Sequence, residues 1–174
     1  MRILLLTPPM TQLNTPYPAT AYLTGFLRQH AAAHDLDVRQ ADPAIELFLR
    51  VFSRDGLTAI AEELAARVED SDDEPPPTIA HFLAHAQQYV DTVDAVIGFL
   101  QGRDPALAMR LATRMFVPEG PRFAAIAPGG DDPLQWAFGK LGVADRGKHL
   151  ASLFVDDLAD AVRDGIQPHF ELSR

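Results

Sequence analysis

The sequence predicts an α/β fold, with an incomplete Rossmann-like β–α–β opening over residues 1–43 and a predominantly α-helical extension or insertion over residues 44–174. Three observations predict it. A short apolar run at residues 2–6 stops at two prolines. A helix-spaced segment and a short alternating segment follow that run. Beyond Pro43, nearly every apolar stretch repeats at the three- and four-residue spacing of an amphipathic helix.

The run at residues 2–6 is typical of a strand that is buried on both faces, as in a parallel sheet. Pro8 and Pro9 end this strand, because proline lacks the N–H group that a strand ladder needs. The chain then runs through a loop that contains Asn14 and Tyr17.

A helix is expected to begin near Ala19 and a second strand to cover residues 36–40, ending at Asp42-Pro43. If the two strands pair in parallel, the three elements form one right-handed β–α–β unit. Four apolar residues of the helix form one stripe: Tyr22, Leu23, Phe26 and Leu27.

The remainder predicts a series of helices. Apolar spacing indicates helices on both sides of Asp55-Gly56, and an acidic loop follows at residues 69–77. Thr78 is expected to cap one long helix that reaches Leu100. Further helices are expected after Asp104-Pro105, after Asp132-Pro133 and from Asp145 to Gly165. Residues 123–127 fit either a third strand or a loop.

Composition excludes several classes of function. The 174 residues include no cysteine, which rules out disulfides, zinc–thiolate sites and an iron–sulfur cluster held by this chain. The net charge of −9 is concentrated in residues 61–100, where nine acids face one arginine. A nucleic-acid partner is therefore not expected, because phosphate binding needs a basic face. No apolar run is long enough for a membrane span and no signal peptide is recognised, so a cytoplasmic location is expected.

Two clusters of polar side chains suggest possible functions. His81 and His85 share a helix face at a spacing that metal sites use, but no third ligand is evident, so a structural pair is favoured over a metal enzyme. Four aspartates at spacings of three and four form an acidic stripe on the last helix: Asp156, Asp157, Asp160 and Asp164. A solvated or docking face is favoured over paired catalytic carboxylates.

The loop after the first strand is the principal candidate site. The sequence has no glycine-rich G-x-G-x-x-G or phosphate-binding G-x-x-x-x-G-K-[ST] motif and no G-x-S-x-G nucleophile elbow. In open α/β sheets, ligands bind at the carboxyl ends of the strands, which is where this loop lies. It offers Thr7, Pro8, Pro9, Asn14 and Tyr17. The alternative is an ordinary strand-to-helix connection.

Three short segments carry a resemblance to a known family: residues 2–9 (RILLLTPP), 18–28 (PATAYLTGFLR) and 38–42 (VRQAD). They resemble the N-terminal cobalamin-binding domain of cobalamin-dependent radical SAM proteins. Looser similarity to a helical insertion of one bacterial subgroup comes from residues 99–105, 118–123 and 154–160. The resemblance implies that the loop residues Thr7, Pro8, Pro9, Asn14 and Tyr17 contact cobalamin.

The resemblance also implies that this chain lacks part of the family's machinery. The Cys-x3-Cys-x2-Cys motif, which holds the iron–sulfur cluster that cleaves S-adenosylmethionine, is absent. We therefore expect a non-catalytic front portion, whose chemistry belongs to the remainder of a longer radical SAM polypeptide or to a partner subunit. No Asp-x-His-x-x-Gly motif is present, so cobalt would have no protein imidazole ligand. A stand-alone helical protein-interaction module without a small-molecule ligand is the alternative.

Overall fold

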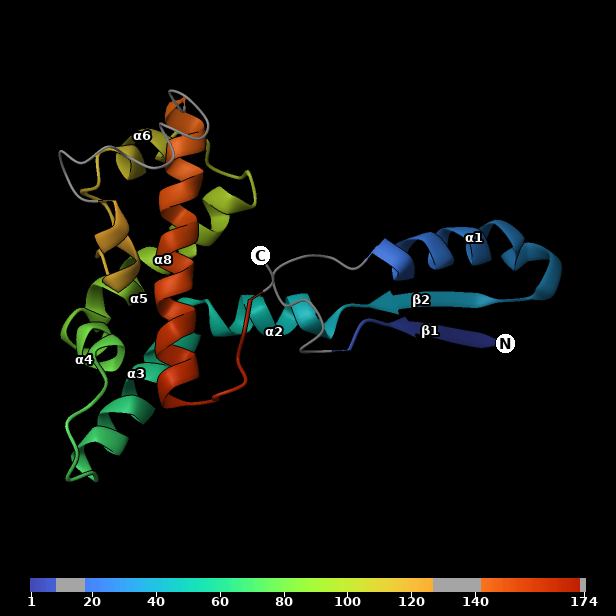
Figure 1. Ribbon diagram of the computed structural model, residues 1–174. Helices are drawn as coiled ribbons and strands as arrows, with labels where there is room; N and C mark the ends of the chain where they lie inside the picture. The colour runs from blue at the N-terminus through green and yellow to red at the C-terminus, as the bar shows by residue number, and fades with distance from the viewer. Residues whose placement is uncertain (9–17, 127–141, 173–174) are drawn as a thin grey trace. The chain divides into compact units, whose positions relative to one another are not determined.

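The computed structural model describes residues 1–8, 18–126 and 142–172 (Figure 1). It divides the chain into two compact units. Unit 1 comprises Met1–Val51 with Glu171–Arg174, and unit 2 comprises Phe52–Phe170. Helix α2 (Pro43–Val51) belongs to unit 1.

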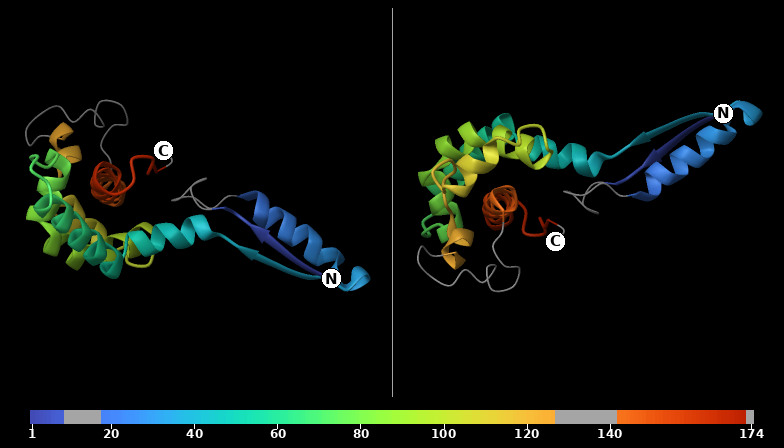
Figure 2. Two further views of the ribbon diagram at one scale, coloured as in Figure 1. Left: turned by 90° about the horizontal axis from the view of Figure 1, so that it is seen from below. Right: turned by 90° about the horizontal axis from the view of Figure 1, so that it is seen from above.

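Unit 1 contains strand β1 (Arg2–Leu6), helix α1 (Pro18–His34), strand β2 (Asp37–Ala41) and helix α2 (Pro43–Val51). The two strands pair in parallel, from Arg2 opposite Asp37 to Leu6 opposite Ala41. Helix α1 runs alongside both strands in all three views (Figures 1 and 2). The opening β–α–β order predicted from the sequence is confirmed, as is the largely helical character of the described residues beyond Pro43.

Helix α1 covers only one face of this small sheet. The register places Ile3 and Val38 on the covered face, where Val38 is buried. Most of the apolar stripe of α1 is not buried against the sheet, because Tyr22, Leu23 and Phe26 are 80%, 51% and 60% exposed. A sheet of two strands is too narrow to cover so wide an apolar stripe, and the buried position at the centre of the helix is Thr24 instead.

Unit 2 is a helical assembly. Its elements are α3 (Arg54–Glu69), α4 (Pro77–Ala84), α5 (Ala86–Leu100), α6 (Leu107–Ala112), the 3-10 turn η1 (Pro121–Ala125) and α8 (Val143–Gly165). The long helix α8 contacts α4, α5, α6 and η1 and runs beside them in Figure 1. Phe154 of α8 is fully buried, and its ring centre lies 5.3 Å from that of Tyr89 on α5.

Several local predictions for unit 2 change in detail. The long helix expected from Thr78 to Leu100 is two helices, separated at His85. Thr78 does not cap its own helix, because its hydroxyl donates to Asp164 at 2.7 Å. Residues 121–125 form a 3-10 turn, so of the two alternatives for residues 123–127 the described part does not form a strand. The helix expected after Asp132-Pro133 lies outside the described residues.

A side-chain cap begins helix α3 of unit 2, whereas α4, α5, α6 and α8 have none among the described residues. The Ser53 hydroxyl accepts the Gly56 N–H at 3.1 Å and begins α3. The Asp104 carboxylate accepts the Ala106 N–H at 3.2 Å, just before α6. Among the helices described, none combines the length and the apolar character that crossing a membrane requires.

Candidate functional site

Thr7 lies directly after β1, at the carboxyl end of the small sheet. Its N–H donates to the carbonyl of Ala41 at 3.1 Å, so the parallel ladder extends one residue beyond β1. The side chain is only 2% exposed, and its Oγ1 lies 3.2 Å from Oγ1 of Thr20 in the first turn of α1. Pro8 is the next residue and is exposed. Pro9, Asn14 and Tyr17 lie outside the described residues.

Thr24 lies one helical turn beyond Thr20 on the side of α1 that faces the sheet. It is buried, and its hydroxyl has no hydrogen-bond partner among the described residues. Leaving a buried hydroxyl without a hydrogen bond costs about 1–3 kcal/mol of folding free energy. This hydroxyl is therefore available to bind a ligand or a water. Sequence reasoning missed both Thr20 and Thr24. Their four-residue spacing, inside a segment judged by its apolar stripe, was the available signal.

Asp42, directly after β2, has a structural role as the N-terminal cap of α2. Its Oδ1 accepts the N–H of Ile45 at 3.1 Å and caps the first turn of α2. This carboxylate is therefore engaged by the backbone of its own chain.

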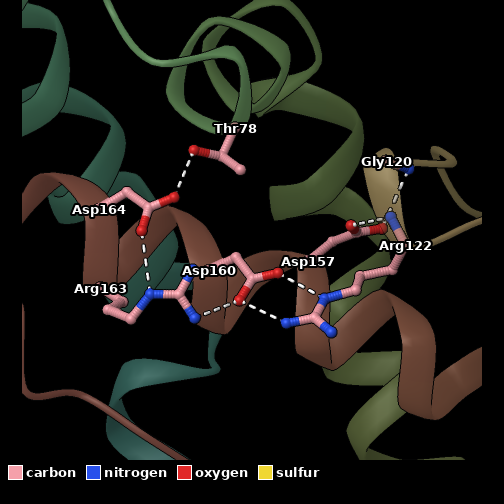
Figure 3. A network of polar contacts seen from close by, with 7 residues as sticks. All are labelled: Thr78, Gly120, Arg122, Asp157, Asp160, Arg163 and Asp164. Carbon is pink, nitrogen blue, oxygen red and sulfur yellow. Dashed lines mark hydrogen bonds and ion pairs between the residues drawn. The ribbon is translucent and has the colours of Figure 1, made fainter.

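A second polar cluster lies in unit 2, where the expected solvated stripe of aspartates is partly wrong (Figure 3). Asp157 and Asp160 are buried, 6% and 8% exposed. Asp157 accepts the backbone N–H groups of Gly120 at 3.1 Å and Arg122 at 2.9 Å. Because these partners are more than thirty residues away in sequence, helical periodicity could not reveal them.

Asp160 is the centre of an ion-pair network. Arg122 donates through Nε at 2.5 Å and through Nη2 at 2.8 Å, and Arg163 donates through Nη1 at 2.7 Å. Arg163 also pairs with Asp164 at 3.0 Å, and Asp164 accepts from Thr78 (Figure 3). The network ties η1 and α4 to α8. Its acceptors are saturated by the chain itself, which favours a structural role.

A second set of polar contacts, made by Arg114, holds the segment between α6 and η1. Arg114 has a positive φ of 59° and makes a two-pronged ion pair with Glu119. Its Nη1 also donates to the carbonyl of Ile126. One guanidinium thus closes the loop that presents Gly120 and Arg122 to α8.

His81 and His85 form a stacked pair, with ring centres 4.3 Å apart. Nδ1 of His85 lies 3.0 Å from the carbonyl of His81, and Nε2 of His81 is buried without a partner among the described residues. Burial, and then the neighbouring His85, lower the pKa of His81. Within the described part of the chain, no three side chains of the metal-binding kinds come together.

Asp157 gives a testable pH dependence. Burial is the main cause that raises its pKa to about 6, against the opposing effect of the two backbone N–H donors. A carboxyl whose pKa is higher in the folded state binds protons more tightly when folded, so its contribution to stability falls as pH rises from about 4 to about 6. We expect Asp157→Asn to lack this decline.

The measurement is urea unfolding of both proteins at pH 4, 5, 6 and 7. Between pH 4 and 6 the unfolding free energy of the wild type should fall relative to that of Asp157→Asn. A side-chain carboxyl resonance of Asp157 that titrates at or below pH 4 would contradict this expectation.

No family profile matches this chain, and no curated protein or solved structure is detectably similar to it.

Proposed function

We propose that this chain is the N-terminal, non-catalytic part of a cobalamin-dependent radical SAM protein, and that its Rossmann-like β1–α1–β2 unit helps to hold the corrin. The proposal rests on the buried hydroxyl group of Thr7, directly after β1. Thr7 is buried there against Thr20, and one turn further along α1 lies Thr24, whose hydroxyl has no hydrogen-bond partner among the described residues. Ligands of parallel α/β sheets bind at this end of the strands.

The chemistry of these residues suits a corrin. Its periphery carries amide groups, which hydroxyls can bind as donors or acceptors, and its ring offers apolar surface. His30 is exposed in the last part of α1, far along the helix from Thr20, and Pro8 at the near end carries no ligand nitrogen. The resemblance implies no protein imidazole ligand for cobalt, because the sequence lacks the Asp-x-His-x-x-Gly motif.

The resemblance to radical SAM proteins implies a division of labour. When bound, cobalamin supplies the organometallic chemistry of its cobalt, while the residues of this chain bind, orient and shield it. The sequence has no cysteine, so the iron–sulfur cluster and its S-adenosylmethionine belong to a separate domain. The substrate is expected to be bound there as well.

A visible-absorbance titration with hydroxocobalamin tests the proposal. We expect a saturable spectral change and co-elution of cobalamin with the chain on gel filtration. Thr7→Val keeps the shape of the side chain but removes its hydroxyl, so binding should weaken about tenfold, the equivalent of one hydrogen bond.

Thr58→Val is the matched control, because Thr58 is an exposed threonine on α3 in unit 2. It should bind as the wild type does. No spectral change at millimolar cobalamin, or equal weakening by both variants, would contradict the proposed site.

The alternative, a helical interaction module, has less support. It needs an apolar stripe on the helices that is free to dock, yet Leu150, Phe154 and Leu158 of α8 are buried inside unit 2. The large exposed apolar side chains Tyr22, Leu23 and Phe26 are on α1, which belongs to unit 1 and not to this helical assembly.

A further inference from the structure

A cavity of about 190 Å³ lies in unit 2, where α3 ends, α4 begins and α8 ends. All the residues that line it belong to the described part of the chain. Its inner wall is apolar, because Leu64 of α3 and Ile79 of α4 are only 1% and 5% exposed. Gly165 of α8 approaches both side chains so closely that a Cβ at this position would collide with Leu64. The cavity therefore has a packed apolar wall built from three helices.

The exposed part of the lining is acidic. It contributes the carboxylates of Asp73, Glu74 and Asp164 against the single guanidinium of Arg67. Two of these four groups are already neutralised, since Arg67 pairs with Glu63 at 2.7 Å and Asp164 pairs with an arginine of its own helix at 3.0 Å. Asp73 and Glu74 make no ion pair with any described residue. The cavity thus has two uncompensated negative charges beside its apolar wall.

Two helix ends add to the negative potential. Helix α3 ends at Glu69 and helix α8 at Gly165, and the carbonyls at such C-terminal ends attract cations. The N-terminus of α4 has the opposite sign, but it is one short helix against two longer ones. The chain itself places a cation here, because Nη1 of Arg67 donates to the carbonyl of Gly165 at 2.6 Å. A positively charged ligand is therefore favoured over a phosphate or a carboxylate.

The two parts of the lining indicate the kind of cation. A bare metal ion fits poorly, because within the described part of the chain no three side chains of the metal-binding kinds come together. An ion would also make no use of the apolar wall. A lysine or arginine side chain suits both parts, since its methylene stem packs on apolar surface while its charged head stays at the polar edge.

We infer that this cavity receives a lysine or arginine side chain from a basic segment of a partner protein. The stem packs against Leu64 and Ile79, and the charged head lies beside the carboxylates of Asp73 and Glu74. This inference concerns unit 2 and does not require corrin binding.

A protein segment fits better than a small amine because the acidic surface extends beyond the cavity. Five of the six residues from Glu69 to Glu74 are acidic, and all five are exposed. Three of these acids lie outside the cavity lining: Glu69, Asp70 and Asp72. A single amine would leave them uncompensated, whereas a segment with several basic residues complements the charge of the whole loop.

Fluorescence anisotropy with the full chain tests the inference at about 0.15 M salt, where diffuse surface attraction is largely screened. The probe is a labelled synthetic peptide in which lysines alternate with glycines. The comparison peptide has 2,4-diaminobutyrate in place of each lysine, so it keeps the amines but has stems shorter by two methylenes. We expect the comparison peptide to bind about fivefold more weakly, because less of its stem reaches the apolar wall.

Two double variants separate the cavity from the rest of the acidic loop. Asp73→Asn/Glu74→Gln removes two charges from the cavity lining, and Asp70→Asn/Asp72→Asn removes two charges from the same loop outside it. All four side chains are exposed, so both proteins should fold. The first variant should bind the lysine peptide about tenfold more weakly, and the second about twofold.

Four outcomes would overturn the inference. Equal affinity for the two peptides, or equal weakening by the two double variants, would show that the acidic loop attracts cations without using the cavity. No binding at millimolar peptide would exclude the site. Binding of pentylamine as tightly as the lysine peptide would assign the cavity to a small amine. Self-association without peptide that is lost in Asp73→Asn/Glu74→Gln would assign it to a second copy of the chain.

Discussion

Gly120→Ala is expected to lower the unfolding free energy of unit 2 by about 3–5 kcal/mol, the cost of disrupting a buried charged group. A Cβ at this position would lie 2.5 Å from both Cγ and Oδ2 of Asp157. The backbone of Gly120 is extended, with φ of −87°, so alanine suffers no conformational penalty there. The expected cost is therefore steric. The carboxylate must move, and it loses the N–H groups of Gly120 and Arg122.

Gly98→Ala is the matched control. Gly98 lies inside α5, where an added Cβ would meet no atom within 4 Å. That variant should be unchanged or more stable by up to about 1 kcal/mol, because alanine favours the helix. Urea unfolding followed by circular dichroism measures both. Equal stability of the two variants would show that Gly120 does not need to approach Asp157 so closely.

The sequence was sufficient for features that local patterns determine. A short apolar run stopped by prolines predicts β1, and three- to four-residue spacing predicts helices such as α8, expected from Asp145 and observed from Val143. The break of the long helix at His85 was not foreseen, because its apolar spacing continues from α4 into α5.

Features that depend on distant partners could not be predicted in this way. Asp157 and Asp160 were assigned to a polar face because periodicity carries no information about Gly120 and Arg122. Conversely, the apolar stripe that contains Tyr22 and Phe26 is typical of a buried helix face, but the two described strands are too few to cover it.

Only part of the candidate site could be predicted from the sequence, again because some of its features depend on packing between distant residues. The position of Thr7 at the end of β1 follows from strand order alone. Its contact with Thr20 and the burial of Thr24 depend on how α1 lies across the sheet. Hydroxyl groups on an inward helix face give no periodic apolar signal, so only the packed structure identifies them.

Arg122→Leu is the second substitution with a large expected effect. Removal of one partner from a buried ion pair typically costs about 3–5 kcal/mol, and we expect about 3 kcal/mol because Arg163 still pairs with Asp160. Arg163→Leu is the control, since Arg163 is about as exposed as Arg122 but gives Asp160 one hydrogen bond, and its removal leaves both bonds from Arg122. It should cost about 1 kcal/mol, in the range of an exposed pair.

The pH dependence separates a loss of charge pairing from a loss of packing. Burial alone would raise the pKa of Asp160, but the hydrogen bonds and charges of Arg122 and Arg163 outweigh it and hold the pKa below its ordinary value. A carboxylate with a lowered folded-state pKa stabilises the fold above its unfolded pKa and loses that contribution as pH falls. Without Arg122 the contribution is lost at higher pH, so the acid-unfolding midpoint of Arg122→Leu should rise above that of Arg163→Leu.

The double variant Arg122→Leu/Asp160→Leu measures how much of the loss in Arg122→Leu comes from leaving the Asp160 carboxylate without Arg122. It removes the buried carboxylate together with its principal partner, so no uncompensated charge remains, and replacing a buried pair by apolar residues is often neutral. It should therefore recover part of the stability that Arg122→Leu loses, and its acid-unfolding midpoint should no longer depend on Asp160. If the double variant is less stable than Arg122→Leu, then Asp160 contributes chiefly through Arg163, and the bond to Arg122 is not what holds η1 to α8.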